Sequence, residues 1–164
     1  MSEPQRSRPL MKHYGVSDKD DGMMAWQWVD EQMRKARNYW ICSARPDGRP
    51  HVAPVWGVWH EGTLYFGSSR TSRKGRNIAH NAHVAIHLES GDDTVIFEGV
   101  LEEVADSALL AALTSIYREK YAMNDVALSS TGDSVCYALR PEMALSWLEK
   151  DFPNTATRWQ FGTS

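Results

Sequence analysis

Cysteines are scarce in this sequence, and the two present, Cys42 and Cys136, are in no CxxC or similar spacing. Isolated cysteines are usually small buried apolar residues, so we expect neither a disulfide nor a metal-binding pair. No apolar run approaches the roughly 20 residues that a membrane-spanning helix needs. The first residues are polar with mixed charge and lack the apolar core of a signal peptide, so we expect a cytoplasmic protein with no membrane partner.

The sequence also lacks an excess of positive charge. It has 18 Lys and Arg against 21 Asp and Glu, which gives a formal net charge of -3. Without an overall basic field, nucleic acid is not an expected partner. The 164 residues are about the length of one domain that can bury a core without disulfides or metal. Residues 1–20 have little periodicity and are predicted to be a tail, flexible or ordered only on a partner. Residues 21–164 are predicted to be the domain.

Periodic patterns predict a mainly β protein with flanking helices. Apolar residues at steps of three and four predict a helix within 21–37, and Asp106 is the expected N-cap of a second helix. About seven short β-rich runs are joined mainly by tight turns, and Gly99 is expected to mark a bulge or a close approach. The runs cover residues 38–44, 51–60, 63–69, 83–89, 94–104, 134–141 and 143–150. Such strands favour an antiparallel sheet that closes into a barrel and so removes its edges.

The segment "SSRTSRKGRNIAHN", residues 68–81, concentrates positive charge without an acidic residue of its own. It follows a predicted strand and has good helix formers after Gly75, so we place it at a strand-to-helix junction. Backbone N–H groups at a helix start, together with Ser, Arg and Lys side chains, can cradle a phosphate. A solvated surface turn is the alternative, and the GxxxxGK[ST] spacing of a nucleotide phosphate loop is absent.

Two further stretches could contact a ligand. Pro54 and Gly57 interrupt the run 51–60, which predicts that a flat ligand or another backbone lies close there. Trp56 beside them is either a core residue or a cofactor platform. Near the C-terminus, Arg158 and Trp159 lie on a segment that we expect to be too exposed for the central core, with an ordinary packed terminus as the alternative.

No catalytic acid, base or nucleophile and no metal site can be assigned from the sequence. His80, His83 and His87 span a change from helix to strand, so they are not expected to converge on a metal. Glu98 could orient a ligand inside the barrel or be an exposed or paired strand residue. His51 follows a turn and could meet either the ligand or solvent.

Four stretches in the same order resemble a known family: "SARPDGRPHVAPVWGVWHEGTLYFGSS", "SRKGRNIAHNAHVAI", "VIFEGVLEEVAD" and "TATRWQF". They are similar to the pyridoxamine 5'-phosphate oxidase-like flavin and deazaflavin oxidoreductases, which have the FMN-binding split-barrel fold. The resemblance covers residues 36–161. Within the superfamily, Lys74, Arg76 and Asn77 match the K-x-R-N element of the F420-dependent group.

The resemblance implies a homodimer with FMN or coenzyme F420 at the subunit interface. It implies phosphate contacts from one group of residues and contacts to the ring from a second. The phosphate group is Ser69, Ser72, Arg73 and Lys74, with Arg76 and Asn77 close behind. The ring group is Pro54, Val55 and Trp56, the backbone near Gly67 and Ser68, and Arg158 and Trp159 contributed by the second subunit.

One departure from the family matters. The substrate-recognising RLHDR-type motif and the longer basic C-terminus of true pyridoxamine phosphate oxidases are absent, so oxidation of vitamin B6 is not expected. The resemblance instead implies an oxidoreductase that transfers hydride to or from a small conjugated substrate, with the chemistry supplied by the ring. The alternatives are a non-catalytic carrier or sensor of a flavin or haem-like molecule, and a basic cluster that docks an acidic protein.

Overall fold

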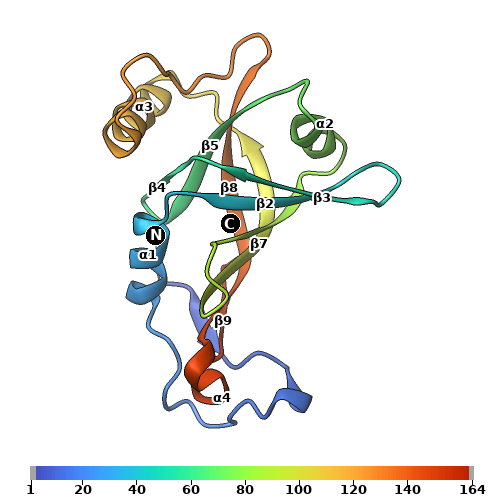
Figure 1. Cartoon of the computed structure of the whole chain (residues 1–164), viewed down its shortest axis with the longest axis vertical. Helices are drawn as coiled ribbons and strands as arrows, with labels where there is room; N and C mark the ends of the chain where they lie inside the picture. Colours follow the sequence, from blue (N-terminus) through green and yellow to red (C-terminus); the bar gives the residue numbers. More distant parts are fainter. Residues whose placement is uncertain (1–2, 163–164) are drawn as a thin grey trace.

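A single antiparallel sheet dominates the computed structural model, which describes residues 3–162 (Figure 1). The main path of the sheet runs β1-β9-β8-β7-β6-β2-β3, while β5 pairs with both β4 and β8. The strands are β1 (Gln5–Ser7), β2 (Tyr39–Ala44), β3 (Pro50–Val55), β4 (Val58–His60), β5 (Thr63–Ser69), β6 (His83–His87), β7 (Asp93–Glu103), β8 (Ser134–Leu148) and β9 (Thr157–Gln160). The predicted mainly β, antiparallel architecture is confirmed.

The helices flank this sheet without covering all of it. They are α1 (Trp26–Lys35), α2 (Arg73–His80), α3 (Ser107–Tyr121) and α4 (Phe152–Thr155), with short 3-10 turns η1 (Lys12–Tyr14) and η2 (Glu149–Asp151). Figure 1 shows α2 and α3 at the upper end of the molecule, on either side of β5. As predicted, Asp106 caps α3, because its carboxylate accepts the backbone N–H groups of Ala108 and Leu109.

Strand β8 is continuous over Ser134–Leu148, so the prediction of two separate strands broken near Pro141 was wrong. Its register with β7 shifts between Glu98 and Gly99, which places Pro141 opposite Gly99. Proline has no N–H to donate, and a bulge is where a strand tolerates it. The predicted bulge at Gly99 is confirmed. A Cβ at Gly99 would lie 2.3 Å from the carbonyl oxygen of Arg140, so only glycine fits there.

The run 51–60 is the opposite case, because it forms two strands, β3 and β4, instead of one. The break falls at Trp56 and Gly57. A Cβ at Gly57 would lie 2.8 Å from the carbonyl oxygen of Tyr65. Of the two possibilities that the sequence left open, the close neighbour of Gly57 is therefore another backbone segment.

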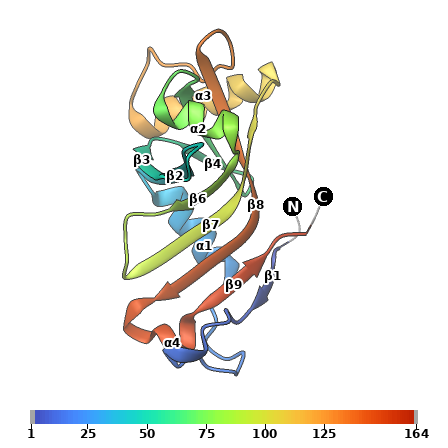
Figure 2. The same cartoon turned by 90° about the vertical axis from the view of Figure 1, so that its right-hand side faces the viewer.

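The N-terminal segment also differs from the expected tail. Residues Gln5–Ser7 form β1, which pairs with β9. The guanidinium of Arg8 donates to the carbonyl oxygens of Lys19, Asp21, Asn154 and Ala156 at 2.6–2.9 Å. These bonds tie the first described residues to the C-terminal part of the chain, and Figure 2 shows β1 beside β9. Residues 1 and 2 lie outside the described range.

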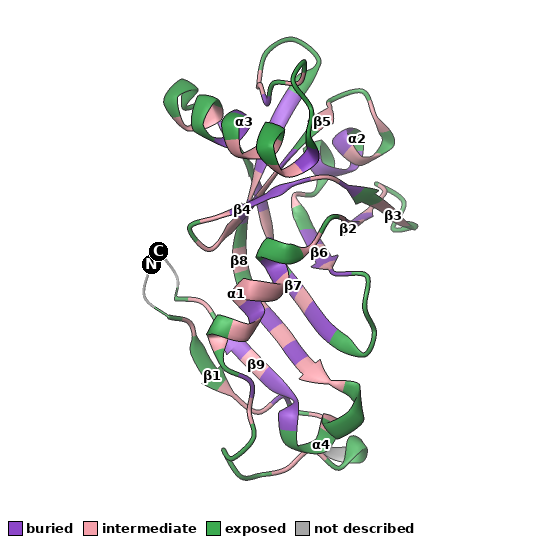
Figure 3. Ribbon diagram, turned by 60° about the vertical axis from the view of Figure 1, so that its left-hand side comes forward, coloured by how far each residue is buried: buried purple, intermediate pink, exposed green. Residues whose placement is uncertain are grey.

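The core includes one face of β6 and β7. Along most of these two strands, buried residues alternate with partly or fully exposed ones (Figure 3). Its largest fully buried side chains include Trp159, Tyr39, Phe66 and Phe97. On β3, Pro50, Val52 and Pro54 are exposed, whereas Val55 belongs to the core. Both cysteines are free thiols. Within residues 3–162, no helix is long and apolar enough to cross a membrane.

Candidate functional site: the start of helix α2

The basic segment forms the predicted strand-to-helix junction. Strand β5 ends at Ser69 and α2 begins at Arg73, with Ser72 as its N-cap. The Ser72 hydroxyl accepts the backbone N–H of Gly75 at 2.9 Å and donates to the carbonyl oxygen of Ser69 at 2.7 Å. This cap fixes the direction in which the first turn of the helix presents its N–H groups.

Gly75 allows the first turn of α2 to lie directly against the loop before it. A Cβ at this position would lie 2.3 Å from the carbonyl oxygen of Ser69 and 2.7 Å from that of Arg70. Real Cβ atoms do not approach backbone oxygens so closely, so a side chain here would force the loop and the helix apart. Close packing of α2 against the loop thus requires the glycine between Lys74 and Arg76.

Acidic residues from distant parts of the chain neutralise one side of the segment. Arg70 forms an ion pair with Glu103, which holds the pKa of that carboxyl below its usual range. The carboxylate of Asp133 accepts the Ser69 hydroxyl at 2.6 Å and the backbone N–H of Thr71 at 3.1 Å. Of the residues predicted to contact phosphate, Ser69 is therefore already engaged within the chain.

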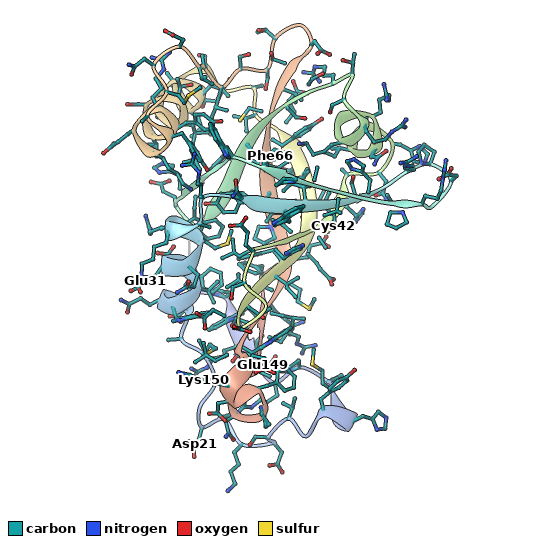
Figure 4. The ribbon with its side chains drawn as sticks, viewed as in Figure 1. Asp21, Glu31, Cys42, Phe66, Glu149 and Lys150 are labelled. Carbon is teal, nitrogen blue, oxygen red and sulfur yellow. The ribbon has the colours of Figure 1, made fainter. Side chains whose placement is uncertain are left out.

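The remaining cations differ in their surroundings. Lys74 is half-buried, and its ammonium lies 5.5 Å from the ring centroid of Phe66 on β5 (labelled in Figure 4). Burial lowers the pKa of Lys74. Arg73 is exposed, and so is Arg76, whose guanidinium donates to the carbonyl oxygen of Thr71 at 2.7 Å. Among the described residues, neither Arg73 nor Lys74 forms an ion pair with a carboxylate.

Asn77 anchors α2 to the barrel. It is fully buried, and its amide donates to the hydroxyl of Ser43 on β2 at 3.0 Å. Its Oδ1 atom is buried and has no hydrogen-bond partner among residues 3–162. We call the group Ser72, Arg73, Lys74 and Asn77 the α2 cradle. Unpaired cations and a capped helix start give it the chemistry of a phosphate-binding site.

The three predicted ring contacts at the end of β3 and directly after it have different surroundings. Pro54 is exposed on β3, at the end of the main sheet path, whereas Val55 is a core residue. Trp56 is half-buried and stacks on Tyr121 with centroids 4.6 Å apart and planes 5° apart. The Arg37 guanidinium carbon lies 5.0 Å from the Trp56 ring centroid. One face of Trp56 is therefore taken by α3.

Gly67 and Ser68 lie on the last part of β5, directly before the α2 cradle. Gly67 is exposed, and a Cβ there would lie 3.1 Å from the Leu128 side chain. The Ser68 hydroxyl is 3.4 Å from that of Ser72. The structure thus brings Ser68 together with the cradle.

The C-terminal pair does not form a unit with the cradle within one chain. Trp159 is fully buried and its indole N–H donates to the Ser146 hydroxyl at 2.9 Å. The expectation that this segment is too exposed for the core is wrong for Trp159, because pairing of β9 with β8 turns its ring inward. Arg158 is the neighbour of Trp159 on the same strand, so its side chain points to the opposite face of the sheet. It is half-buried and donates to the Ser7 hydroxyl at 3.2 Å.

Comparison with known proteins gives the chain a family. The family profile described as pyridoxamine 5'-phosphate oxidase matches residues 25–148, which is more than half of the sequence and spans β2 to β8. The chain belongs to the pyridoxamine 5'-phosphate oxidase family. The resemblance stated from the four sequence stretches is confirmed. No curated protein matches the sequence.

Solved structures share the family's fold. A conserved hypothetical protein from Mycobacterium tuberculosis is 20% identical over 82% of this chain and 91% of its own, with a TM-score of 0.66. An F420 reductase is 23% identical over 70% of this chain and 94% of its own, with a TM-score of 0.57. A heme binding protein from Mycobacterium smegmatis is 18% identical over 76% of this chain and 54% of its own, with a TM-score of 0.58. At these identities the likeness concerns the fold alone.

Two of the hollows in the described part of this family member lie away from α2. One, of about 530 Å³, lies beside Trp26, Asp30 and Phe161. The other, of about 370 Å³, lies beside Cys42, Ser43 and Glu98 on the sheet. Neither of these two hollows is lined by residues of the α2 cradle.

Sequence reasoning left three residues near the basic segment out of the predicted site. Asp133 and Glu103 pair with it only because β5 and β7 both lie beside β8. Arg45, in the turn between β2 and β3, has a buried Nε atom without a hydrogen-bond partner among the described residues. Its place in a Pro-Asp-Gly turn gave no signal for a site, because arginines in turns are usually solvated.

Proposed function

We propose that this family member is an oxidoreductase that binds FMN or coenzyme F420 through the α2 cradle and transfers hydride to or from a small conjugated substrate. The observation that supports it most is the cradle itself, with Arg73 and Lys74 unpaired beside the capped start of α2. A phosphate dianion accepts several charge-assisted hydrogen bonds from such a group, each worth about 1.5–3 kcal/mol.

The proposed position of the ring is along the exposed side of β3. Pro54 removes a backbone donor, and the edge strand leaves room for a flat ring beside it. When bound, the flavin or deazaflavin ring supplies the hydride chemistry, while the protein orients it and excludes water. Arg73 and Lys74 would hold the phosphate, and Ser68 would lie between phosphate and ring.

The proposed assembly is a homodimer. Strand β3 ends the main sheet path with Val52 about half exposed, at 52%. A second copy could close the cradle and present its own Arg158, which has no carboxylate partner within residues 3–162. We leave Trp159 out of the proposed site, because its ring is fully buried in its own core.

The visible absorption spectrum after incubation with each cofactor and gel filtration tests the proposal. The protein fraction should retain the absorbance of FMN or of F420, at a protein concentration in the micromolar range. The proposal fails if neither cofactor co-elutes. The same spectrum recorded with haem tests the carrier alternative, which the fold likeness to a heme binding protein favours.

A second measurement separates an enzyme from a cofactor carrier. Stopped-flow mixing with NAD(P)H should show reduction of the bound FMN, and a conjugated acceptor added afterwards should reoxidise it; chemically reduced F420 should likewise pass its hydride to that acceptor. A carrier would bind the cofactor tightly but show no exchange of hydride.

A further inference from the structure

The turn between β2 and β3 faces the start of α2 across the barrel. In the β2–β3 register His51 lies opposite Ser43, so both side chains point to the same face of the sheet. Ser43 accepts the amide of Asn77 from α2 at 3.0 Å. Figure 1 shows α2 above this end of β2 and β3. His51 therefore lies on the face that α2 covers.

Two buried nitrogen atoms near the cations of the α2 cradle have no partner among the described side chains. They are Nε of Arg45, on the turn, and Nδ1 of His51, on β3. Oδ1 of Asn77 is buried and unpartnered as well, but it is an acceptor and cannot bind an anion. Buried polar atoms are almost always paired in folded proteins, so two unpaired nitrogens beside several cations indicate a missing acceptor.

The charges that act on His51 all have the same sign. Burial lowers the pKa of His51, and the neighbouring cations Arg45, Lys74 and Arg73 lower it further. Lys74 and Arg73 come from α2 and Arg45 from the turn. The acid on the turn, Asp47, is paired with Arg49. In the chain without ligand His51 is therefore neutral at pH 7, surrounded by three cations.

We propose that Arg45 and His51 form the wall of the phosphate site opposite the α2 cradle, and that His51 takes up a proton when a dianion enters. The inference rests on the proposed function only in that the anion is the phosphate of the cofactor. Two negative charges would offset the three cations that keep His51 neutral, and the imidazolium would then donate to the anion.

The sign of the pH dependence follows from this coupling. Because the dianion raises the pKa of His51, the bound form holds more protons than the free form in the range between the two pKa values. Binding should therefore tighten as the pH falls from the bound-state pKa of His51 towards its free-state pKa, which lies below the ordinary 6.5. Above that range the affinity should be flat.

Sulfate is the probe, because it keeps both charges where histidines titrate, between about pH 5.5 and about pH 7.5. At constant ionic strength the dissociation constant of sulfate should become about threefold smaller, or more, when the pH is lowered across this range. His51→Gln should abolish the dependence. The control His83→Gln, an exposed residue whose side chain lies on the outward face of β6, should keep it. Equal slopes in all three proteins would overturn the inference.

Arginine variants test the wall itself. Arg45→Gln should weaken sulfate binding by about tenfold, as expected for a lost charge-assisted hydrogen bond. Arg49→Gln removes the same charge from the same turn, but Arg49 is paired with Asp47, so its effect should stay within about twofold. If both variants bind alike, Arg45 is not part of the site.

A measurement on the unaltered protein covers the case in which a variant fails to fold. The NMR titration of the His51 imidazole should move to higher pH when sulfate is added, while that of His83 stays in place. Unchanged titration of His51 at saturating sulfate would disprove the coupling.

The cofactor experiment separates the two proposals. If neither FMN nor F420 co-elutes but sulfate binding depends on His51, the function is wrong and this inference holds. If a cofactor binds equally well to Arg45→Gln, His51→Gln and their controls, the function holds and this inference is wrong.

Discussion

Helices α2 and α3 each bring a half-buried lysine to one end of the barrel, and the two lysines differ in what surrounds them. Lys120 on α3 donates to the hydroxyl of Tyr39 at 2.9 Å and to the carbonyl oxygen of Gly57 at 3.0 Å. Lys74 on α2 lies over Phe66, and within residues 3–162 no hydrogen-bond acceptor was found for its ammonium. We call Tyr39, Gly57, Lys120 and Tyr121 the α3 corner.

The α3 corner is closed by its own hydrogen bonds. The Tyr121 hydroxyl donates its single hydrogen to the carbonyl oxygen of Arg37 at 2.7 Å, and it accepts the N–H of Gly57 at 2.9 Å. The α2 cradle keeps two cations, Arg73 and Lys74, without a carboxylate partner among the described residues. Satisfied polar networks stabilise a fold, whereas unsatisfied ones are retained where a ligand completes them. This contrast agrees with a structural role for the α3 corner and with the binding role that we propose for the α2 cradle.

The largest effect is expected at Gly75. Gly75→Ala would place a Cβ 2.3 Å from the Ser69 carbonyl oxygen, so α2 must move and stability should fall by about 3 kcal/mol. Urea unfolding followed by circular dichroism measures it. Gly91→Ala is the matched control, since nothing lies within 4 Å of the position that its Cβ would take, and it should change little. Equal stabilities of the two variants would show that α2 does not press on the loop.

Removal of one hydroxyl tests the α3 corner. Tyr121→Phe leaves the N–H of Gly57 and the carbonyl oxygen of Arg37 without their partner, which should cost about 2 kcal/mol. Cofactor affinity should not change. The control is Tyr117→Phe, whose hydroxyl has no hydrogen bond among the described residues. Urea unfolding with equal midpoints for both variants would contradict a structural role for this network.

Lys74 gives the reverse pattern of effects. Lys74→Met keeps a flexible chain over Phe66 but removes the charge, so FMN or F420 should bind about tenfold more weakly, by about 1.4 kcal/mol. Stability should hold or rise, because burial disfavours the ammonium, as its lowered pKa indicates. Fluorescence titration and thermal unfolding measure the two effects. Lys35→Met, an exposed lysine on α1, is the control. A large loss of stability with unchanged affinity would reverse the assignment.

The smallest effect concerns pH. Burial lowers the pKa of Lys120 to about 8, from 10.5 in the unfolded chain. The unfolded state then binds more protons between these values, so the contribution of Lys120 makes stability rise with pH from about 8 to about 10. Because Lys120 is only half-buried and solvent screens its charge, the whole rise should stay below about 1 kcal/mol. Comparison of urea unfolding at several pH values in the wild type and in Lys120→Met isolates it. The rise should be absent from the variant, and an identical rise in both proteins would refute the assignment.

Local patterns in the sequence determined most of the strands and the local features of the site. The serine before a run of helix formers specified the N-cap of α2, because a cap depends on local backbone alone. Gly99 marked the place of the bulge, although the strand opposite it, β8, lies far along the chain. The family resemblance named the right fold. It could not show that Trp159 is a core residue, because its burial depends on pairing with β8.

Tertiary structure decided which charges of the basic segment remain unpaired. Glu103 and Asp133, both far along the chain, neutralise Arg70 and engage Ser69, because strand register sets these contacts. The register of β7 with β8 allows β8 to continue past Pro141. The register of β2 with β3 places His51 opposite Ser43, beneath α2. The sequence thus determined that a basic segment begins helix α2. Only the long-range packing of strands decided which side chains face it, since no local pattern encodes a contact between distant segments.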